Sequence, residues 1–347
     1  NGLFWHTDHY LDAKTATHRT FSRHNDTSST PGQTGGGPGA EHCYTSGHLY
    51  HYLLTGNNRS KEAVLELAQW ITNSHEGAPG LLAELLALKK QEIPKLRALL
   101  KGEYVTTHRY PFTRGTGNYL NALLDAHYVE PDKGWLQRAE AVIRGTIHPA
   151  DDINKRNLMD VETGWSYLIL LTSIVKYINL KADTGGRDEH WHYATASFLH
   201  YAQWMRDNER PFLDDPEALE FANQTWVAQD IRKAMLMFQA ASLAPNSSGS
   251  YVNKGQEWLT YVTDTLKSTS EASLARLLII LMQNDGPQHL VSSQASRHFA
   301  PPPSARGLYK TPVLSATELL GRIADFFDRH VAALRAVFGL LHSVQIR

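Results

Sequence analysis

The segment YPFTRGTGNYLNALLDAHY, residues 110–128, followed by GWLQRAEAVIRG, residues 134–145, decides the fold class. A polar turn that contains glycine opens an apolar helical stretch, a short loop follows, and a second helix returns. The same order recurs in stretches that begin at Gly35, Met159 and Phe221. Repeated helical hairpins predict an all-α protein whose equivalent helix ends lie on one rim, so that loops far apart in sequence can form one site.

The composition restricts the class of partner. Lys and Arg together number 34 and Asp and Glu 35, which gives a net charge of -1 and no basic field for nucleic acid or anionic lipid. We therefore expect no nucleic-acid partner. No apolar run approaches the roughly 18 residues of a membrane span, so no span is expected. The single cysteine, Cys43, excludes an intramolecular disulfide.

The organisation along the chain predicts one domain, residues 1–347, with a Ser/Thr/Gly/Pro loop at 25–39 and a Pro-rich loop at 286–312. Residues 80–102 predict an extra helical pair broken at Pro94. Strand signals are nearly absent. We expect about five to six hairpins, and the set is either complete or incomplete. They are compatible with an open solenoid or with a closed (α/α) toroid or barrel around a central funnel.

Two polar stripes favour the funnel. Residues spaced by four and three positions share one helical face, and here that face carries Tyr, His, Asn and Arg in place of the Lys and Glu of a solvated surface. A hydrogen-bonded buried network would have the same composition. The first stripe comprises Arg114, Asn118, Asn121, Asp125 and Tyr128, and the second comprises Glu41, Tyr44, His48, His51 and Tyr52.

The candidate site residues lie at or near the predicted rim, where free N–H groups favour anionic ligands. Trp165 and Trp226 each lie three residues into a helix and are either sugar platforms or packing between helices. The catalytic candidates are His42, Tyr44, His48, Arg114 and Glu162. The substrate-binding candidates are Glu41, Asn118, Trp165, Trp226 and Asp230.

These residue types suit two reactions. A β-eliminating lyase needs a group that neutralises a uronate carboxylate, here Arg114 and Asn118, and a base or acid, here His48, His42 or Tyr44. Glu162 would orient a partner or bind hydroxyls. A glycoside hydrolase needs two carboxylates across the scissile bond, and Glu41, Glu162 and Asp230 are the candidates.

Metal and cofactor signals are weak. His6, Asp8 and His9 are close in sequence, and His48 and His51 have a usable ligand spacing, but neither set matches a specific motif. Cys43 follows His42, yet adjacent helical residues point about 100° apart, which argues against a nucleophilic pair. No cofactor and no bound metal are expected, and a divalent cation is the alternative.

The hairpin openings GGGPGAEHCYTSGHLYHYLLTG and RGTGNYLNALLDAHY, with the return WLQRAEAVIRG, resemble the six-hairpin (α/α)-toroid superfamily of carbohydrate-active proteins. The chain looks most like the C-terminal toroid domain of exo-rhamnogalacturonan lyase-type proteins, over roughly residues 5–266. The resemblance implies a toroid, a secreted or cell-surface location, and β-rich domains or partner chains beyond this sequence. It fixes no catalytic residue, since it rests on helix-start phrases.

The leading interpretation is a polysaccharide lyase that cleaves a uronic-acid-containing polysaccharide or oligosaccharide by β-elimination. The alternatives are a glycoside hydrolase of the same fold and a non-catalytic glycan-binding or structural module of a larger surface protein.

Overall fold

The computed structural model describes residues 23–24, 34–35, 40–77, 81–219, 222–270, 275–289 and 312–344. The chain divides into two compact units: unit 1 comprises Asn1–Ile71 and Tyr110–Lys310, and unit 2 comprises Thr72–Arg109 and Thr311–Arg347. This division differs from the single domain expected over residues 1–347, because residues 72–109 group with the C-terminal segment. Most of the loops expected at 25–39 and 286–312 lies outside the described residues.

The regular secondary structure in the described part of unit 1 consists of helices and of two short strands. The strands β1 (Arg23–His24) and β2 (Thr34–Gly35) have two residues each and pair antiparallel. The all-α prediction is therefore confirmed. The α-helices are α1 (Ser46–Thr55), α2 (Asn58–Glu76, continuing into unit 2), α4 (Arg114–Val129), α5 (Trp135–Arg144), α6 (Val161–Gly164), α7 (Tyr167–Asp183), α8 (Glu189–Asn208), α9 (Gln224–Leu243), α10 (Ser248–Ser268) and α11 (Ala275–Asn284). The short 3₁₀ helices are η1 (Ala40–His42), η2 (Pro131–Lys133), η3 (Ile153–Arg156), η4 (Pro216–Ala218) and η5 (Pro245–Ser247).

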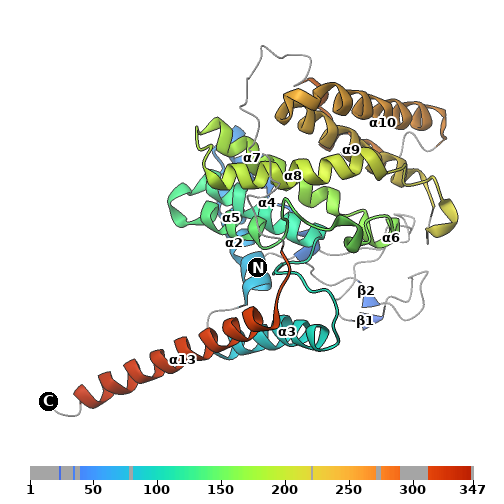
Figure 1. Ribbon diagram of the computed structural model, residues 1–347. Helices are drawn as coiled ribbons and strands as arrows, with labels where there is room; N and C mark the ends of the chain where they lie inside the picture. The colour runs from blue at the N-terminus through green and yellow to red at the C-terminus, as the bar shows by residue number, and fades with distance from the viewer. Residues whose placement is uncertain are drawn as a thin grey trace. The chain divides into compact units, whose positions relative to one another are not determined.

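Consecutive helices of unit 1 pack as hairpins. Helix α4 packs on α5, α7 on α8, and α9 on α10, and α7 in turn packs between α4 and α9 (Figure 1). Helix α1 contacts α4 and α11 contacts α9, so a chain of neighbours runs α1, α4, α7, α9, α11. Large side chains such as Tyr119, Tyr167 and Phe198 are fully buried between these helices. The apolar side chains that recur along these helices therefore face this core.

Helices α4 and α7 cross very closely at Gly117. A Cβ atom at this position would lie 2.8 Å from the backbone N and Cα of Leu170 and 3.0 Å from the carbonyl carbon of Ile169. Because the obstacle is backbone, the two helices would have to separate to accept any side chain. The glycine thus sets the distance between the helices that carry most of the polar groups described below.

Gly117→Ala is expected to destabilise the protein by about 1–3 kcal/mol, since the cost of forcing the helices apart exceeds the gain in helix propensity. Gly249→Ala in α10 is the matched control, because a Cβ there meets nothing within 4 Å. Urea unfolding of both variants measures the difference. A Gly117→Ala variant as stable as Gly249→Ala would show that α4 and α7 are not in close contact.

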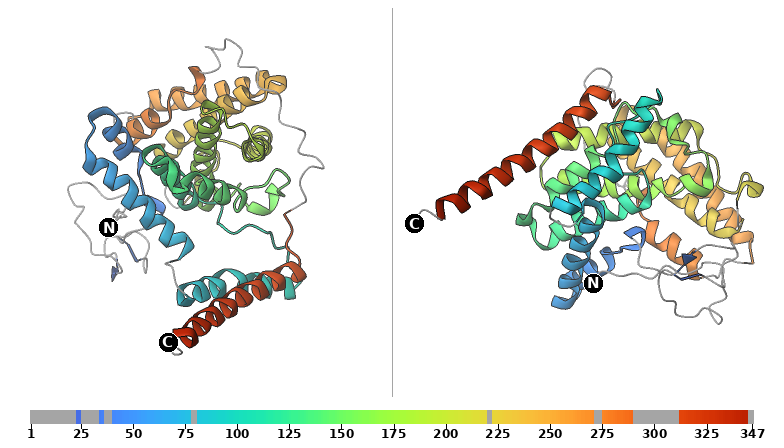
Figure 2. Two further views of the ribbon diagram at one scale, coloured as in Figure 1. Left: turned by 90° about the vertical axis from the view of Figure 1, so that its left-hand side faces the viewer. Right: turned by 90° about the horizontal axis from the view of Figure 1, so that it is seen from below.

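In unit 2, the helix α3 (Leu81–Leu100) packs on α13 (Ala316–Val344), as Figure 2 also shows. The prediction of a helical pair broken at Pro94 is wrong, because α3 continues through Pro94 as one helix. Thr106 and Val313 form an isolated antiparallel bridge. Beside it, the Thr107 N–H donates to the Pro312 carbonyl. Within the described residues, no helix is long and apolar enough to cross a membrane.

Candidate functional site

The rim of unit 1 is organised by a contact between η1 and the first turn of α4. The Arg114 Nε and Nη2 atoms donate to Glu41 Oε2 at 3.0 and 2.8 Å. The Asn118 side-chain amide donates to the Glu41 backbone carbonyl at 2.5 Å. The structure thus brings these three predicted residues together. It places Glu41 and Tyr44 before α1, which begins at Ser46, so they do not belong to one helical stripe with His48.

Tyr44 lies at this rim with its side chain about half exposed, at 49 %. Its ring meets the His42 ring edge-on, with centroids 6.0 Å apart. Burial raises the pKa of Tyr44, while the positive charges of Arg114, Arg232 and Arg276 oppose the shift. Tyr44 is therefore a protonated phenol at neutral pH, and three arginines against the one carboxylate of Glu41 would favour an anionic ligand beside it.

Arg232, in the interior of α9, interacts electrostatically with Tyr44 and was not among the residues predicted from the sequence. Its Nε donates to Gln229 Oε1 at 2.8 Å and its Nη1 donates to Asn284 Oδ1 at 2.9 Å. In the described part of the chain, no carboxylate lies within salt-bridge distance of it. Burial lowers the pKa of Arg232 to about 10, with Tyr44 opposing, so the guanidinium stays charged at neutral pH. An arginine held by neutral amides and lacking a counter-ion is prepared for an anion.

The two tryptophans contact each other. Trp165 and Trp226 meet edge-on with ring centroids 6.0 Å apart, and the Arg114 guanidinium lies 5.9 Å from the Trp165 centroid. Trp226 is only 7 % exposed and also packs on Phe212, which favours the second of its two predicted roles, packing between helices. Trp165 is partly exposed and keeps a ring near the rim.

Asp230 belongs to a buried charge cluster. Lys233 Nζ lies 2.8 Å from Glu209 Oε2 and 2.9 Å from Asp230 Oδ1, and the Phe212 N–H donates to Asp230 Oδ2 at 3.0 Å. Asp230 and Lys233 are fully buried, and Glu209 also accepts from the Tyr167 hydroxyl. The full burial of Asp230 and its pairing with Lys233 favour a structural role over the substrate-binding role predicted for it.

The cluster makes the stability pH-dependent. Burial raises the pKa of Asp230 to about 6, with Lys233 and the Phe212 N–H opposing. Because the pKa of Asp230 is higher in the folded state, its contribution to the unfolding free energy is fully present below the pKa of the unfolded state, about 3.9. This contribution is lost as the pH rises through about 6. Asp230→Asn lacks this titration. Its unfolding free energy is expected to rise relative to the parent by at least about 1 kcal/mol between pH 4 and 7, measured by urea unfolding. Parallel pH profiles would contradict the assignment.

Below the rim, the stripe of α4 forms a network with α1 and α7. Asp125 is fully buried and accepts from the Thr45 and Ser46 hydroxyls at 2.5 and 2.9 Å. Lys176 ion-pairs with Asp125 and donates to Asn121 Oδ1 at 2.8 Å. The lower part of the predicted cavity wall is thus a satisfied hydrogen-bonded network. We call these five residues, Thr45, Ser46, Asn121, Asp125 and Lys176, the central network.

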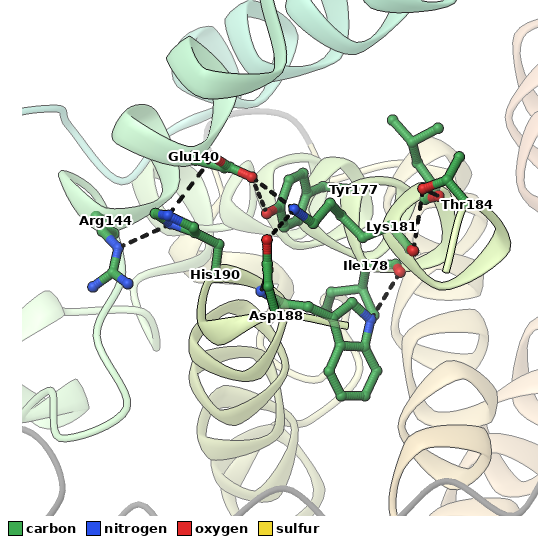
Figure 3. A network of polar contacts seen from close by, with 10 residues as sticks. Glu140, Arg144, Tyr177, Ile178, Lys181, Thr184, Asp188 and His190 are labelled. Atoms are coloured by element: carbon green, nitrogen blue, oxygen red, sulfur yellow. Dashed lines mark hydrogen bonds and ion pairs between the residues drawn. The ribbon is translucent and has the colours of Figure 1, made fainter. Parts of the chain in front are cut away.

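A second charged cluster joins α5, α7 and α8 (Figure 3). Lys181 Nζ donates to Glu140 Oε1 at 3.0 Å and to Asp188 Oδ2 at 2.6 Å, and the Tyr177 hydroxyl donates to the same Glu140 oxygen at 2.9 Å. Asp188 also caps α8 by accepting from the Trp191 N–H. Although burial opposes it, the bonds from Lys181 and Trp191 hold the pKa of Asp188 below its usual value. Both carboxylates are bound within the cluster, which is typical of a network that stabilises the fold.

Two further predicted residues lie on α1 and α6. His48 is half-buried on α1 and makes no described contact with the rim residues, whereas Glu162 is exposed on α6, three positions before Trp165. His51 bonds to Ser60 through Nδ1. The candidates His6, Asp8 and His9 lie outside the described residues. Among the residues that are described, no three His, Cys, Asp or Glu side chains group in a way that could hold a metal ion.

No protein-family model, curated protein or solved structure matches the chain. The resemblance to the toroid superfamily therefore stays a prediction, and the function rests on the rim geometry.

Proposed function

We propose that the rim binds the carboxylate of a uronic acid in an acidic glycan and that the protein is a polysaccharide lyase. The observation that carries the proposal is Arg232, a charged side chain with amide acceptors alone and no counter-ion in the described chain. Arg114, by contrast, already has Glu41 as a partner. A planar carboxylate would supply the missing counter-ion of the Arg232 guanidinium and accept charge-assisted hydrogen bonds from it.

Two neighbours supply groups for β-elimination. Tyr44 is a protonated phenol at the rim, and His42 contacts its ring. In the proposed step, His42 takes the proton from C5, the electron pair forms the C4–C5 double bond, and the C4–O4 bond breaks. The departing oxygen receives the phenolic proton of Tyr44. Arg232, by neutralising the carboxylate, makes the C5 proton more acidic and stabilises the charge that develops on the carboxylate.

The other rim residues position the reacting groups. The ion pair of Arg114 with Glu41 and the bond from Asn118 hold the segment that leads into His42 and Tyr44. Trp165 lies beside Arg114 with its ring partly exposed, and such a ring suits the apolar face of a neighbouring sugar. His48, which makes no described contact with these groups, has no role in this mechanism.

We propose the finer fold as an (α/α) toroid with α1, α4, α7, α9 and α11 as inner helices. The order of neighbours supports it, since each of these helices packs on the next and α4, α7 and α9 are each followed by a returning helix. Such an arrangement places the starts of α4, α7 and α9 around one mouth. Arg114 and Trp165 lie at such starts.

The hydrolase alternative is less well supported. Of its three candidate carboxylates, Asp230 is buried with Lys233 and Glu41 is paired with Arg114, which leaves Glu162 on the exposed surface. A pair of carboxylates on either side of a glycosidic bond is what that reaction requires.

The test incubates the purified chain with a panel of uronate-containing polysaccharides and follows near-ultraviolet absorbance and new reducing ends in parallel. The proposal expects both signals to rise, because elimination creates a conjugated double bond. New reducing ends without absorbance would replace the lyase by a hydrolase. Silence in both channels together with binding of the same polysaccharides would replace it by a non-catalytic glycan-binding module.

A further inference from the structure

A pocket of about 460 Å³ opens between α1, α4, α7 and α9. Most of its lining residues lie in the middle or the C-terminal half of these helices, whereas Glu41, Tyr44 and Arg114 lie at or before the starts of α1 and α4. Arg114 begins α4 and Tyr128 lies in its last turn. Because a helix rises 1.5 Å per residue, about 20 Å of α4 separates the two. The pocket is therefore a feature distinct from the rim.

The charges of the pocket do not favour an anion. Lys176 lines it, but its ammonium group already bonds to Asp125, to Asn121 Oδ1 at 2.8 Å and to Ser46 Oγ at 3.3 Å. All three of its N–H donors are thus used inside the central network. Asp183 also lines the pocket and adds negative charge.

Gln239 lines the pocket and has a side-chain oxygen with no hydrogen-bond partner among the described residues. The residue is only 9 % exposed, and its side-chain oxygen is buried without a hydrogen bond in the described chain. Asn179 lines the pocket on the neighbouring helix. A buried amide oxygen that is left unsatisfied costs stability, and a hydroxyl or N–H of a molecule bound in the pocket would supply the missing donor.

The pocket lining also includes aromatic and apolar side chains. Tyr50 and Tyr128 are 57 % and 47 % exposed and line the pocket with Leu53, which is 60 % exposed. Two accessible phenol rings beside amide and carboxylate groups form the combination that a sugar ring needs, since its C–H face packs on an aromatic ring and its hydroxyls bond to amides.

We propose that this pocket binds the uncharged pyranose ring of a neutral sugar. The ring would stack on Tyr50 or Tyr128, and its hydroxyls would bond to Gln239, Asn179 and Asp183. The proposal does not depend on the reaction at the rim, because it rests on different residues and on the opposite charge preference.

The test uses methyl glucoside, methyl galactoside, methyl mannoside and methyl rhamnoside as probes, with the methyl glycoside of galacturonic acid as the charged comparison. Saturation-transfer NMR detects binding, and calorimetry measures the affinity. At least one neutral glycoside is expected to bind with a Kd below about 10 mM. Gln239→Leu should weaken it at least tenfold while leaving the unfolding midpoint unchanged or higher, because the change removes an unsatisfied amide. Tyr128→Leu should also weaken it.

Gln256→Leu is the matched control, because Gln256 is exposed on α10 and does not line the pocket. It should bind the glycoside like the parent chain. Three results would overturn the proposal: no neutral glycoside binds, the galacturonide alone binds, or Gln239→Leu keeps the parent affinity with an intact fold.

Discussion

Arg232→Gln is expected to weaken the binding of an acidic oligosaccharide by about 30-fold to about 3,000-fold. Removing one partner of a buried, hydrogen-bonded charge pair costs about 2–5 kcal/mol, and each 1.4 kcal/mol is tenfold in affinity. The loss of stability in the free protein should be much smaller, because the change removes two hydrogen bonds to amide oxygens but also removes a buried charge that has no counter-ion in the described chain. A loss of affinity far larger than the loss of stability is the signature of a ligand-binding arginine.

The matched control is Arg138→Gln, since Arg138 is exposed on α5. Calorimetric titration with an oligogalacturonide and urea unfolding of each variant provide the two readouts. If Arg232→Gln unfolds more easily and binds as tightly as the parent, Arg232 is a structural residue and the proposed site is wrong.

Asp125→Ala is expected to have the largest effect on stability, about 3–5 kcal/mol. The change leaves Lys176 without its carboxylate and removes the acceptor for the Thr45 and Ser46 hydroxyls. A loss of this size can remove most of the stability of a typical domain. Thermal and urea unfolding measure it.

Two further variants separate the ion pair from simple loss of packing. Asp132→Ala, on the exposed η2 segment, should stay within about 0.5 kcal/mol of the parent. The double variant with Asp125→Leu and Lys176→Met should recover most of the loss, because no unpaired buried charge remains. A double variant that is no more stable than Asp125→Ala would show that the charge pair is not what the fold depends on.

The helical character and the hairpin order could be predicted from the sequence, because apolar periodicity and polar turns are local signals. The polar stripe of α4 could also be predicted from the sequence, but the role of each of its residues depends on tertiary contacts. Arg114 and Asn118 reach Glu41 at the rim, whereas Asn121 and Asp125 bond to Ser46 and Lys176 inside the molecule. One stripe thus divides into a rim part and a central network.

The differences at the candidate site have one cause, which is that the burial of a side chain depends on tertiary contacts and cannot be read from the local sequence. Trp226 and Asp230 follow a helix start as a rim residue would, yet Phe212 and Lys233 enclose them. Arg232 was missed because it lies in the interior of α9, away from any helix start. Its signal was a lone arginine in a largely apolar helix, which becomes informative once its neighbours Gln229 and Asn284 prove to be uncharged.

The most direct test of the rim proposal compares one acidic oligosaccharide with its carboxyl-reduced counterpart, which has the same linkages and no charge. Calorimetric affinities are measured for the parent chain and for Arg232→Gln. We predict that the parent binds the acidic form at least tenfold more tightly and that Arg232→Gln removes most of this preference. Equal affinities of the parent chain for the two forms would contradict the proposal that this rim recognises a uronate carboxylate.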